Sequence, residues 1–176
     1  GLPVRAFGSY PGMGHYPGWW WSSTMGDHVG YESLLERDRL MLADFERDVV
    51  AVASQPFGLT GCDGDHIRRH VPDFLLLGRD HVTVVDVKPV EHLDKPEGAQ
   101  VLGWTGRLLG ARGWRYEVWS GASEVLLTNV RFVSQGRRRA LVDSGVVDAL
   151  AKVGEVGMPL EAALPAAHGS TRTDLR

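Results

Sequence analysis

An apolar run that ends in charged residues is the strongest constraint on how this chain folds. Residues 82–85 read Val-Thr-Val-Val and lead at once into Asp86-Val87-Lys88, while a second apolar segment, 71–77, carries Asp73 near its start. Both segments are short and rich in aliphatic side chains, which is typical of strands covered on both faces. Because strand side chains alternate between faces, Asp86 and Lys88 are expected on the same side.

Gly78-Arg79-Asp80 lies between these two segments and predicts a hairpin turn. The hairpin brings Asp73 beside Asp86 and Lys88 on neighbouring strands. Burying a carboxylate costs several kcal/mol unless a cation, a metal or hydrogen bonds compensate it. Two carboxylates that meet also repel each other, and a divalent metal relieves that repulsion. The sequence therefore predicts a hydrolytic metal site at this end of the hairpin.

The other elements follow from hydrophobic periodicity. Helices are expected over 31–45, 97–111, 123–134 and 138–152, and further strands over 49–53 and 114–119. Residues 57–59 are expected to continue the strand that starts at 49, and residues 60–70 to form a polar loop. This order predicts an α/β fold with a mixed central β-sheet flanked by helices.

The expected organisation is one folded domain between two less regular ends. Residues 1–29 are rich in Gly and Pro and predict an irregular arm that carries Trp19-Trp20-Trp21. These aromatics suit packing on the body or on a protein partner, and base stacking is the alternative. The domain is expected over 30–153, followed by a flexible tail over 154–176.

Charge and composition narrow the class of protein. A net charge of −3 is not that of a strongly basic nucleic-acid binder, although acidic metal sites also lower the total. Arg68-Arg69-His70 forms a local basic cluster, for which DNA phosphate contact and a solvated surface both stay open. The single cysteine, Cys62, excludes an internal disulfide framework and a cysteine-based zinc site. No apolar run long enough to span a membrane is present, and a cytoplasmic location is expected.

Hydrolysis of a phosphodiester needs a positioned water, neutralised charge in the transition state and a stabilised leaving oxygen. Carboxylates such as Asp73 and Asp86 can hold one or two Mg²⁺ ions that supply all three. A lysine beside the metal, here Lys88, can orient the attacking water and add positive charge at the phosphate.

Pro72-Asp73 followed by Asp86-Val87-Lys88 resembles the PD-(D/E)XK signature of the restriction-endonuclease-like nucleases. Further segments occur in order around it. They are Glu32-Ser33-Leu34-Leu35-Glu36-Arg37-Asp38, Phe45-Glu46-Arg47-Asp48-Val49-Val50, Gln55-Pro56-Phe57, Val71-Pro72-Asp73-Phe74 and Asp86-Val87-Lys88-Pro89. The series is similar to the nuclease domain of TnsA-type endonuclease subunits of heteromeric transposases, over about residues 30 to 135.

The resemblance implies a restriction-endonuclease-like core and a set of catalytic residues. Glu36, Asp73, Asp86 and Lys88 take the catalytic positions, with Glu36, Asp73 and Asp86 as metal ligands and Glu32 as the alternative helix ligand. Asp86 stands where the family varies among Glu, Gln and Asp. Gln55 could hydrogen-bond near the site, and a structural role at a strand bend is favoured for it.

The implied activity is Mg²⁺-dependent cleavage of double-stranded DNA at transposon ends, with Mn²⁺ able to substitute. The implied partner is a transposase subunit of the DDE type, and an ATPase regulator and a homodimer stay open. Two alternatives remain at this point. One is a nuclease of the same fold in defence, restriction or repair, and the other is a non-catalytic module that binds DNA or protein.

Overall fold

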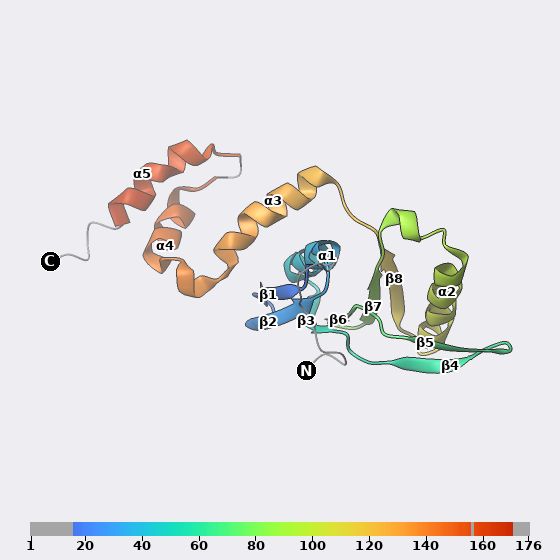
Figure 1. Cartoon of the computed structure of the whole chain (residues 1–176). Coiled ribbons are helices and arrows are strands. Elements are labelled where there is room, and N and C mark those ends of the chain that lie inside the picture. Colours follow the sequence, from blue (N-terminus) through green and yellow to red (C-terminus); the bar gives the residue numbers. More distant parts are fainter. Residues whose placement is uncertain (1–15, 156, 171–176) are drawn as a thin grey trace. The chain divides into compact units, whose positions relative to one another are not determined.

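The computed structural model describes residues 16–155 and 157–170. The strands are β1 (Gly18–Ser22), β2 (Asp27–Tyr31), β3 (Val49–Ser54), β4 (Leu59–Asp63), β5 (His66–His70), β6 (Phe74–Gly78), β7 (Val82–Val87) and β8 (Arg115–Trp119) (Figure 1). The α-helices are α1 (Leu34–Phe45), α2 (Pro96–Gly110), α3 (Glu124–Ser134), α4 (Ser144–Val153) and α5 (Leu160–Ser170). Short 3₁₀ turns are η1 (Val90–His92), η2 (Gln135–Arg137) and η3 (Arg139–Leu141). The chain divides into two compact units, Gly1–Phe132 and Val133–Arg176.

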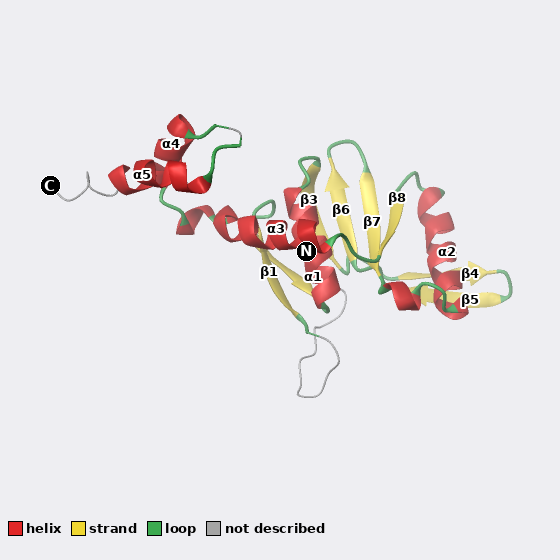
Figure 2. Cartoon of the chain, turned by 90° about the horizontal axis from the view of Figure 1, so that it is seen from above, coloured by secondary structure: helices red, strands yellow, loops and turns green. Residues whose placement is uncertain are grey.

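A four-stranded sheet in the order β3-β6-β7-β8 forms the centre of the first unit (Figure 2). β3, β6 and β7 are antiparallel neighbours, whereas β7 and β8 are parallel. A parallel pair needs a long crossover connection, and α2 supplies it. The expected α/β architecture with a mixed central sheet and flanking helices is confirmed.

The two faces of this sheet are covered by different helices. Val85 and Val87 of β7 belong to one buried cluster with Leu40 and Ala43 of α1. On the other face, Tyr116 of β8 lies so close to α2 that a Cβ added at Gly106 would be 3.1 Å from its Cδ1 atom. The face alternation expected for β7 is therefore confirmed, and Asp86 lies on the α2 side.

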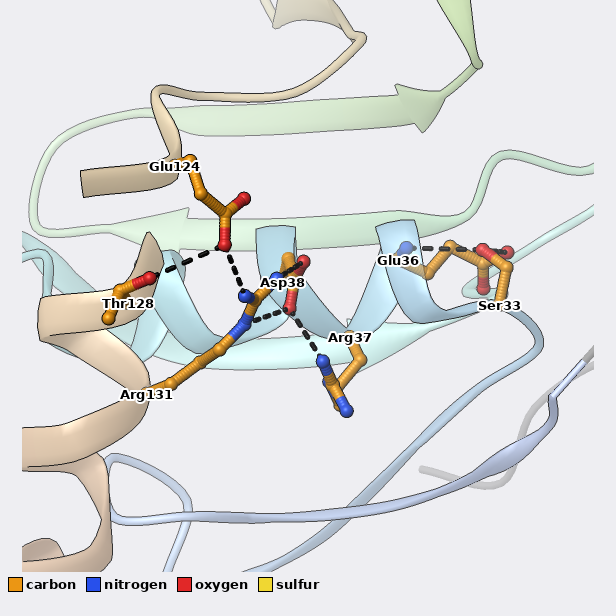
Figure 3. Close-up of polar contacts among 7 residues, drawn as sticks. All are labelled: Ser33, Glu36, Arg37, Asp38, Glu124, Thr128 and Arg131. Atoms are coloured by element: carbon orange, nitrogen blue, oxygen red, sulfur yellow. Dashed lines mark hydrogen bonds and ion pairs between the residues drawn. The ribbon is translucent and has the colours of Figure 1, made fainter. Parts of the chain in front are cut away.

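Local sequence signals explain where α1 begins and how α3 is attached to it. Ser33 is the N-cap and its Oγ accepts a hydrogen bond from the Glu36 N–H at 3.1 Å, so the helix starts later than the expected residue 31. From α3, the Arg131 guanidinium lies 2.6 Å from the buried Asp38 carboxylate of α1 (Figure 3). Arg37 also donates to Asp38, at 3.0 Å, so this carboxylate is paired on two sides.

The irregular arm expected over 1–29 is wrong for the part that the structure describes, and residues 1–15 lie outside that part. β1 and β2 form an antiparallel hairpin that includes Trp19-Trp20-Trp21. The turn is held by Asp44 at the end of α1, which accepts hydrogen bonds from Ser22 Oγ at 2.7 Å and from Thr24 N–H at 2.8 Å. This hairpin is short and is anchored by one buried carboxylate. Its sequence therefore lacks the alternation of polar and apolar residues from which a strand is predicted.

The polar loop expected over 60–70 is also wrong. β4 and β5 pair as a second hairpin, separate from the central sheet, with Asp63 opposite His66. Residues 57–59 do not continue β3, because the chain breaks at Gln55, whose φ of 44° lies in the left-handed region. The Trp104 indole N–H of α2 donates to the Cys62 carbonyl at 3.3 Å, which holds the hairpin on that helix.

The second unit contains α4 and α5, which pack against each other. The first turn of α4 is capped by Asp143, which accepts from the Gly145 N–H at 2.8 Å. The unit starts at Val133 rather than at the expected boundary after residue 153, and α5 occupies part of the expected tail. None of the helices among residues 16–155 and 157–170 combines the length and apolar character that crossing a membrane requires.

Candidate active site

The ends of three neighbouring strands bring the predicted residues to one edge of the central sheet. Gln55 follows β3, Asp73 precedes β6, and Lys88 follows β7. Backbone hydrogen bonds connect these strand ends. The Gln55 N–H donates to the Asp73 carbonyl at 2.8 Å, and the Asp73 N–H donates to the Val85 carbonyl at 3.1 Å. This edge is built from regular backbone pairing, which fixes the side chains that project from it.

Asp73 lies between a backbone donor and a lysine. Its Oδ2 accepts a hydrogen bond from the Val87 N–H at 2.7 Å, and the Lys88 Nζ lies 3.7 Å from the same oxygen. Burial raises the pKa of Asp73 above its usual value, the nearby Asp86 charge adds to this, and Lys88 and the Val87 N–H oppose it. The net upward direction shows that burial of Asp73 outweighs the stabilisation of its ionised form by Lys88 and the Val87 N–H.

Asp86 is fully buried, and both of its oxygens have partners. The His70 Nε2 lies 2.8 Å from Oδ1 and 2.8 Å from Oδ2, and the Tyr116 hydroxyl donates to Oδ2. His70 belongs to β5 and Tyr116 to β8, so three separate strands meet at this carboxylate. Burial and the Asp86 charge keep the pKa of Tyr116 above its usual range, so its hydroxyl remains a donor.

Glu36 lies in the first turn of α1, with its carboxylate turned back to the helix start (Figure 3). Oε2 accepts from the Glu32 N–H at 2.8 Å and Oε1 accepts from Ser33 Oγ at 2.9 Å, which is a capping arrangement. Burial raises the pKa of Glu36 to about 7, and the Asp73 charge acts in the same direction against these hydrogen bonds. Glu36 therefore caps the start of α1, and its pKa also depends on the charge of Asp73.

The structure places Lys88 beside Asp73, with Glu36 and Asp86 within electrostatic range of the same carboxylate. Asp73 is the centre of the group: Lys88 pairs with it, and the charges of Asp73 and Asp86 and of Asp73 and Glu36 interact. Glu36 is the helix glutamate whose pKa is affected by the Asp73 charge. Glu32, the alternative helix ligand, contributes its backbone N–H to the Glu36 carboxylate.

The basic cluster expected to contact DNA separates into three different environments. Arg68 is held inside the hairpin, with its Nε 2.6 Å from Asp63 and its Nη2 2.9 Å from Gln100. Arg69 is exposed on the opposite face of β5. His70 points to Asp86 and not to solvent, so it belongs to the site rather than to a phosphate-binding surface.

Sequence reasoning did not identify Tyr116 or the role of His70. Tyr116 pairs with Val84 across the parallel β7–β8 ladder, and a strand position on the same face as Asp86 is the signal that could have indicated it.

Gln55 is 2% exposed, and its Oε1 has no hydrogen-bond partner. A structural role alone leaves this buried acceptor unexplained.

A different cluster has the tightest ligand geometry among the described residues. Asp48, Asp80 and His81 are the one set that places three carboxylate or imidazole ligand atoms within 4.8 Å of one another. They surround the β6–β7 turn, at the far end of these strands from Asp73 and Asp86, and both carboxylates are exposed. Exposed acidic groups at a turn are common without a metal, so this cluster carries no assignment.

The residues at the Asp73 edge fit a divalent cation by the chemistry of their donors. Mg²⁺ takes oxygen ligands and is commonly held by one or two carboxylates, with water and phosphate completing its shell. Burial raises the pKa values of Glu36 and Asp73, and a bound cation would favour their ionised forms. The unpartnered Gln55 Oε1 is a further buried oxygen beside Asp73. Glu36, Asp73 and Asp86 are the residues that would hold the ion.

Comparison of the chain with models of known protein families gave no match, and comparison with curated protein sequences gave no significant match.

Proposed function

We propose that this protein is a metal-dependent DNA endonuclease that hydrolyses phosphodiester bonds. The observation that carries the proposal is the Asp73 edge of the sheet, where the buried Asp73 carboxylate lies 3.7 Å from the Lys88 ammonium and burial raises the pKa values of both Asp73 and the half-buried Glu36. Ionised carboxylates are costly in such a buried environment unless a cation is bound near them. The same residue types are those that phosphodiester hydrolysis requires.

Each side chain has a role in this proposal that follows from its environment. Glu36, Asp73 and Asp86 supply the carboxylate oxygens for Mg²⁺, with Asp86 acting from a fully buried position. Lys88 places its ammonium group at the reacting phosphate and orients the attacking water. When bound, Mg²⁺ supplies the positive charge that the transition state needs, and Mn²⁺ is expected to replace it.

The finer assignment is a TnsA-like subunit of a heteromeric transposase with a restriction-endonuclease-like core. It is supported by the order of the sequence segments around Glu36, Gln55-Pro56-Phe57, Asp73 and Lys88, and by the mixed sheet that carries them. The substrate in this proposal is double-stranded DNA at transposon ends. The partner is a transposase subunit of the DDE type.

Calorimetric titration with Mn²⁺ distinguishes the Asp73 site from the exposed Asp48, Asp80 and His81 cluster as the place where the metal binds. The variants are Asp73→Asn, at the proposed site, and Asp80→Asn, in the exposed cluster at the β6–β7 turn. We expect saturable binding by the wild type and by Asp80→Asn, and loss of binding in Asp73→Asn. Binding that survives Asp73→Asn and disappears in Asp80→Asn would place the metal at the turn and refute the proposed site.

Cleavage assays on transposon-end DNA, with and without a partner transposase, then test the reaction. We expect Mn²⁺-dependent strand cleavage that is lost in Asp73→Asn and in Lys88→Ala. Metal binding without cleavage under both conditions would favour the non-catalytic module of the same fold.

A further inference from the structure

The Asp86 carboxylate has an unusual environment for a metal ligand, because it is fully buried and already accepts several hydrogen bonds. Its exposed fraction is 0%, and its oxygens contact the His70 Nε2 at 2.8 Å each and the Tyr116 hydroxyl. A carboxylate offers about four acceptor positions. The single His70 Nε2–H is shared between both oxygens and the Tyr116 hydroxyl donates to Oδ2, so Oδ1 has the larger unused acceptor capacity.

Tyr116 is fixed in this contact by its own surroundings. Its ring stands on β8 beside Val84, in the parallel ladder, and α2 passes close over it. A glycine at position 106 makes this approach feasible, because a Cβ there would lie 3.1 Å from Tyr116 Cδ1 and 3.6 Å from Cε1. The hydroxyl is therefore held at Asp86 from two sides, by the strand and by the helix.

His70 connects Asp86 to an element outside the central sheet. It is the last residue of β5, and the β4–β5 hairpin is attached to α2 at several points besides the Trp104 indole. The Arg107 Nη2 lies 2.7 Å from Asp63, and the Arg68 Nη2 donates to Gln100 at 2.9 Å. The imidazole is consequently held by a hairpin whose own position is fixed.

We propose that Tyr116 and His70 are positioning residues that orient the Asp86 carboxylate for metal binding, so that β8 and the β4–β5 hairpin are part of the site. This inference rests on the proposed function. Partners that orient a metal-binding carboxylate or imidazole commonly change metal affinity about 10- to 100-fold when they are removed. Two donors on Asp86 fix both its rotamer and the direction of its remaining lone pair.

Tyr116→Phe is the sharpest variant, because it removes one hydroxyl and keeps the ring that packs under α2. Tyr31→Phe is the matched control: this tyrosine is also half-buried in the first unit, on β2, where it packs against the buried cluster on the α1 side of the sheet. We expect the Mn²⁺ dissociation constant to rise about 10- to 100-fold in Tyr116→Phe and to stay unchanged in Tyr31→Phe. Thermal unfolding in the presence of a chelator separates this effect from loss of the fold.

A second pair of variants tests His70 independently of the tyrosine. His70→Ala removes the donor, whereas His70→Gln places an amide N–H at about the position of Nε2. We expect weakened Mn²⁺ binding in His70→Ala and recovery of most of the affinity in His70→Gln. A residue that only filled space would not distinguish these two side chains in this way.

The outcomes separate the inference from the function on which it rests. If Asp73→Asn abolishes binding while Tyr116→Phe and His70→Ala bind as the wild type does, the metal site stands and the positioning roles are wrong. Tighter binding in Tyr116→Phe also overturns the inference, because Tyr116 would then compete with the metal for Asp86. Absence of Mn²⁺ binding by the folded wild type refutes the proposed function and the inference together.

Discussion

At the scale of single residues, Glu36 has two roles that conflict with each other. Its carboxylate caps the start of α1 through Ser33 and the Glu32 N–H, and a capping carboxylate is most useful when it is ionised. Burial and the charge of Asp73 nevertheless raise its pKa to about 7. A cation bound at the Asp73 edge would relieve this conflict, since it favours the ionised form of Glu36.

This conflict predicts how stability depends on pH in the metal-free protein. In the unfolded chain Glu36 ionises near the ordinary glutamate pKa of 4.5, whereas in the folded protein its pKa is about 7. Between these values the folded state binds more protons, so the free energy of unfolding decreases as the pH rises through this window. Glu36→Gln removes this dependence, and we expect it to gain roughly 2 kcal/mol relative to the wild type between pH 5 and pH 8.

Urea unfolding of the wild type and Glu36→Gln, in a chelator at both pH values, measures this difference. Titrating groups that do not interact with Glu36 contribute equally to both proteins and cancel in the comparison. Parallel pH dependence of the two proteins would mean that Glu36 ionises normally in the fold.

Three of the four predicted residues could be placed together because their pattern is local, whereas Glu36 was assigned only through the resemblance. Asp73, Asp86 and Lys88 belong to one hairpin, whose turn and strand alternation are readable from adjacent residues. His70 and Tyr116 could not be assigned to the group in the same way. Their contacts with Asp86 depend on the separate β4–β5 hairpin and on the parallel β7–β8 pair, which hydrophobic periodicity does not encode.

At the scale of elements, the two missed hairpins share a physical cause. β1–β2 and β4–β5 are two-stranded and carry polar or mixed side chains, so neither shows the alternation of a strand with one buried face. Turn chemistry was the available signal. Gly64 has a φ of 62° and precedes Asp65 at the β4–β5 turn, a Gly-Asp pair that favours a tight hairpin.

The hydrogen bonds that Asp44 accepts predict how much the attachment of the first hairpin to α1 contributes to stability. Burial opposes its ionisation, but hydrogen bonds from Thr24, Ser22 and Ser23 outweigh burial and lower its pKa. This stabilisation is therefore present above the pKa of the unfolded chain and is lost as the pH falls through the lower, folded value. We expect Asp44→Asn to cost about 2–3 kcal/mol at pH 7, because one of two charged acceptor oxygens is lost.

Asp27→Asn is the control for this prediction, since Asp27 is an exposed residue of the same hairpin whose carboxylate accepts only a local hydrogen bond, from the His28 N–H at 2.7 Å. Urea unfolding at pH 7 should show a large loss for Asp44→Asn and almost none for Asp27→Asn. Equal midpoints for the two variants would contradict the anchoring role of Asp44.

At the scale of the whole molecule, the proposed site and its supports all lie in the first compact unit. The buried cluster on α1, the central sheet and the residues around Asp86 precede Phe132. α3 is joined to α1 by the pair between Arg131 and Asp38, whose carboxylate is buried. The first unit therefore has its own core, and α3 supplies one of the two arginines that pair with Asp38.

Two truncations test this division. A chain that ends after Ser134 keeps α3 and removes most of the second unit, and we expect it to unfold cooperatively and to bind Mn²⁺ with the affinity of the full chain. A chain that ends after Ala122 also removes α3 and takes Arg131 away from Asp38. Because the buried Asp38 carboxylate then keeps Arg37 but loses the closer of its two cations, we expect a further loss of about 1–3 kcal/mol. Thermal unfolding followed by circular dichroism measures the stability of each truncated chain, and titration with Mn²⁺ measures its metal affinity. Non-cooperative unfolding of the chain that ends after Ser134 would show that the second unit is required for the fold.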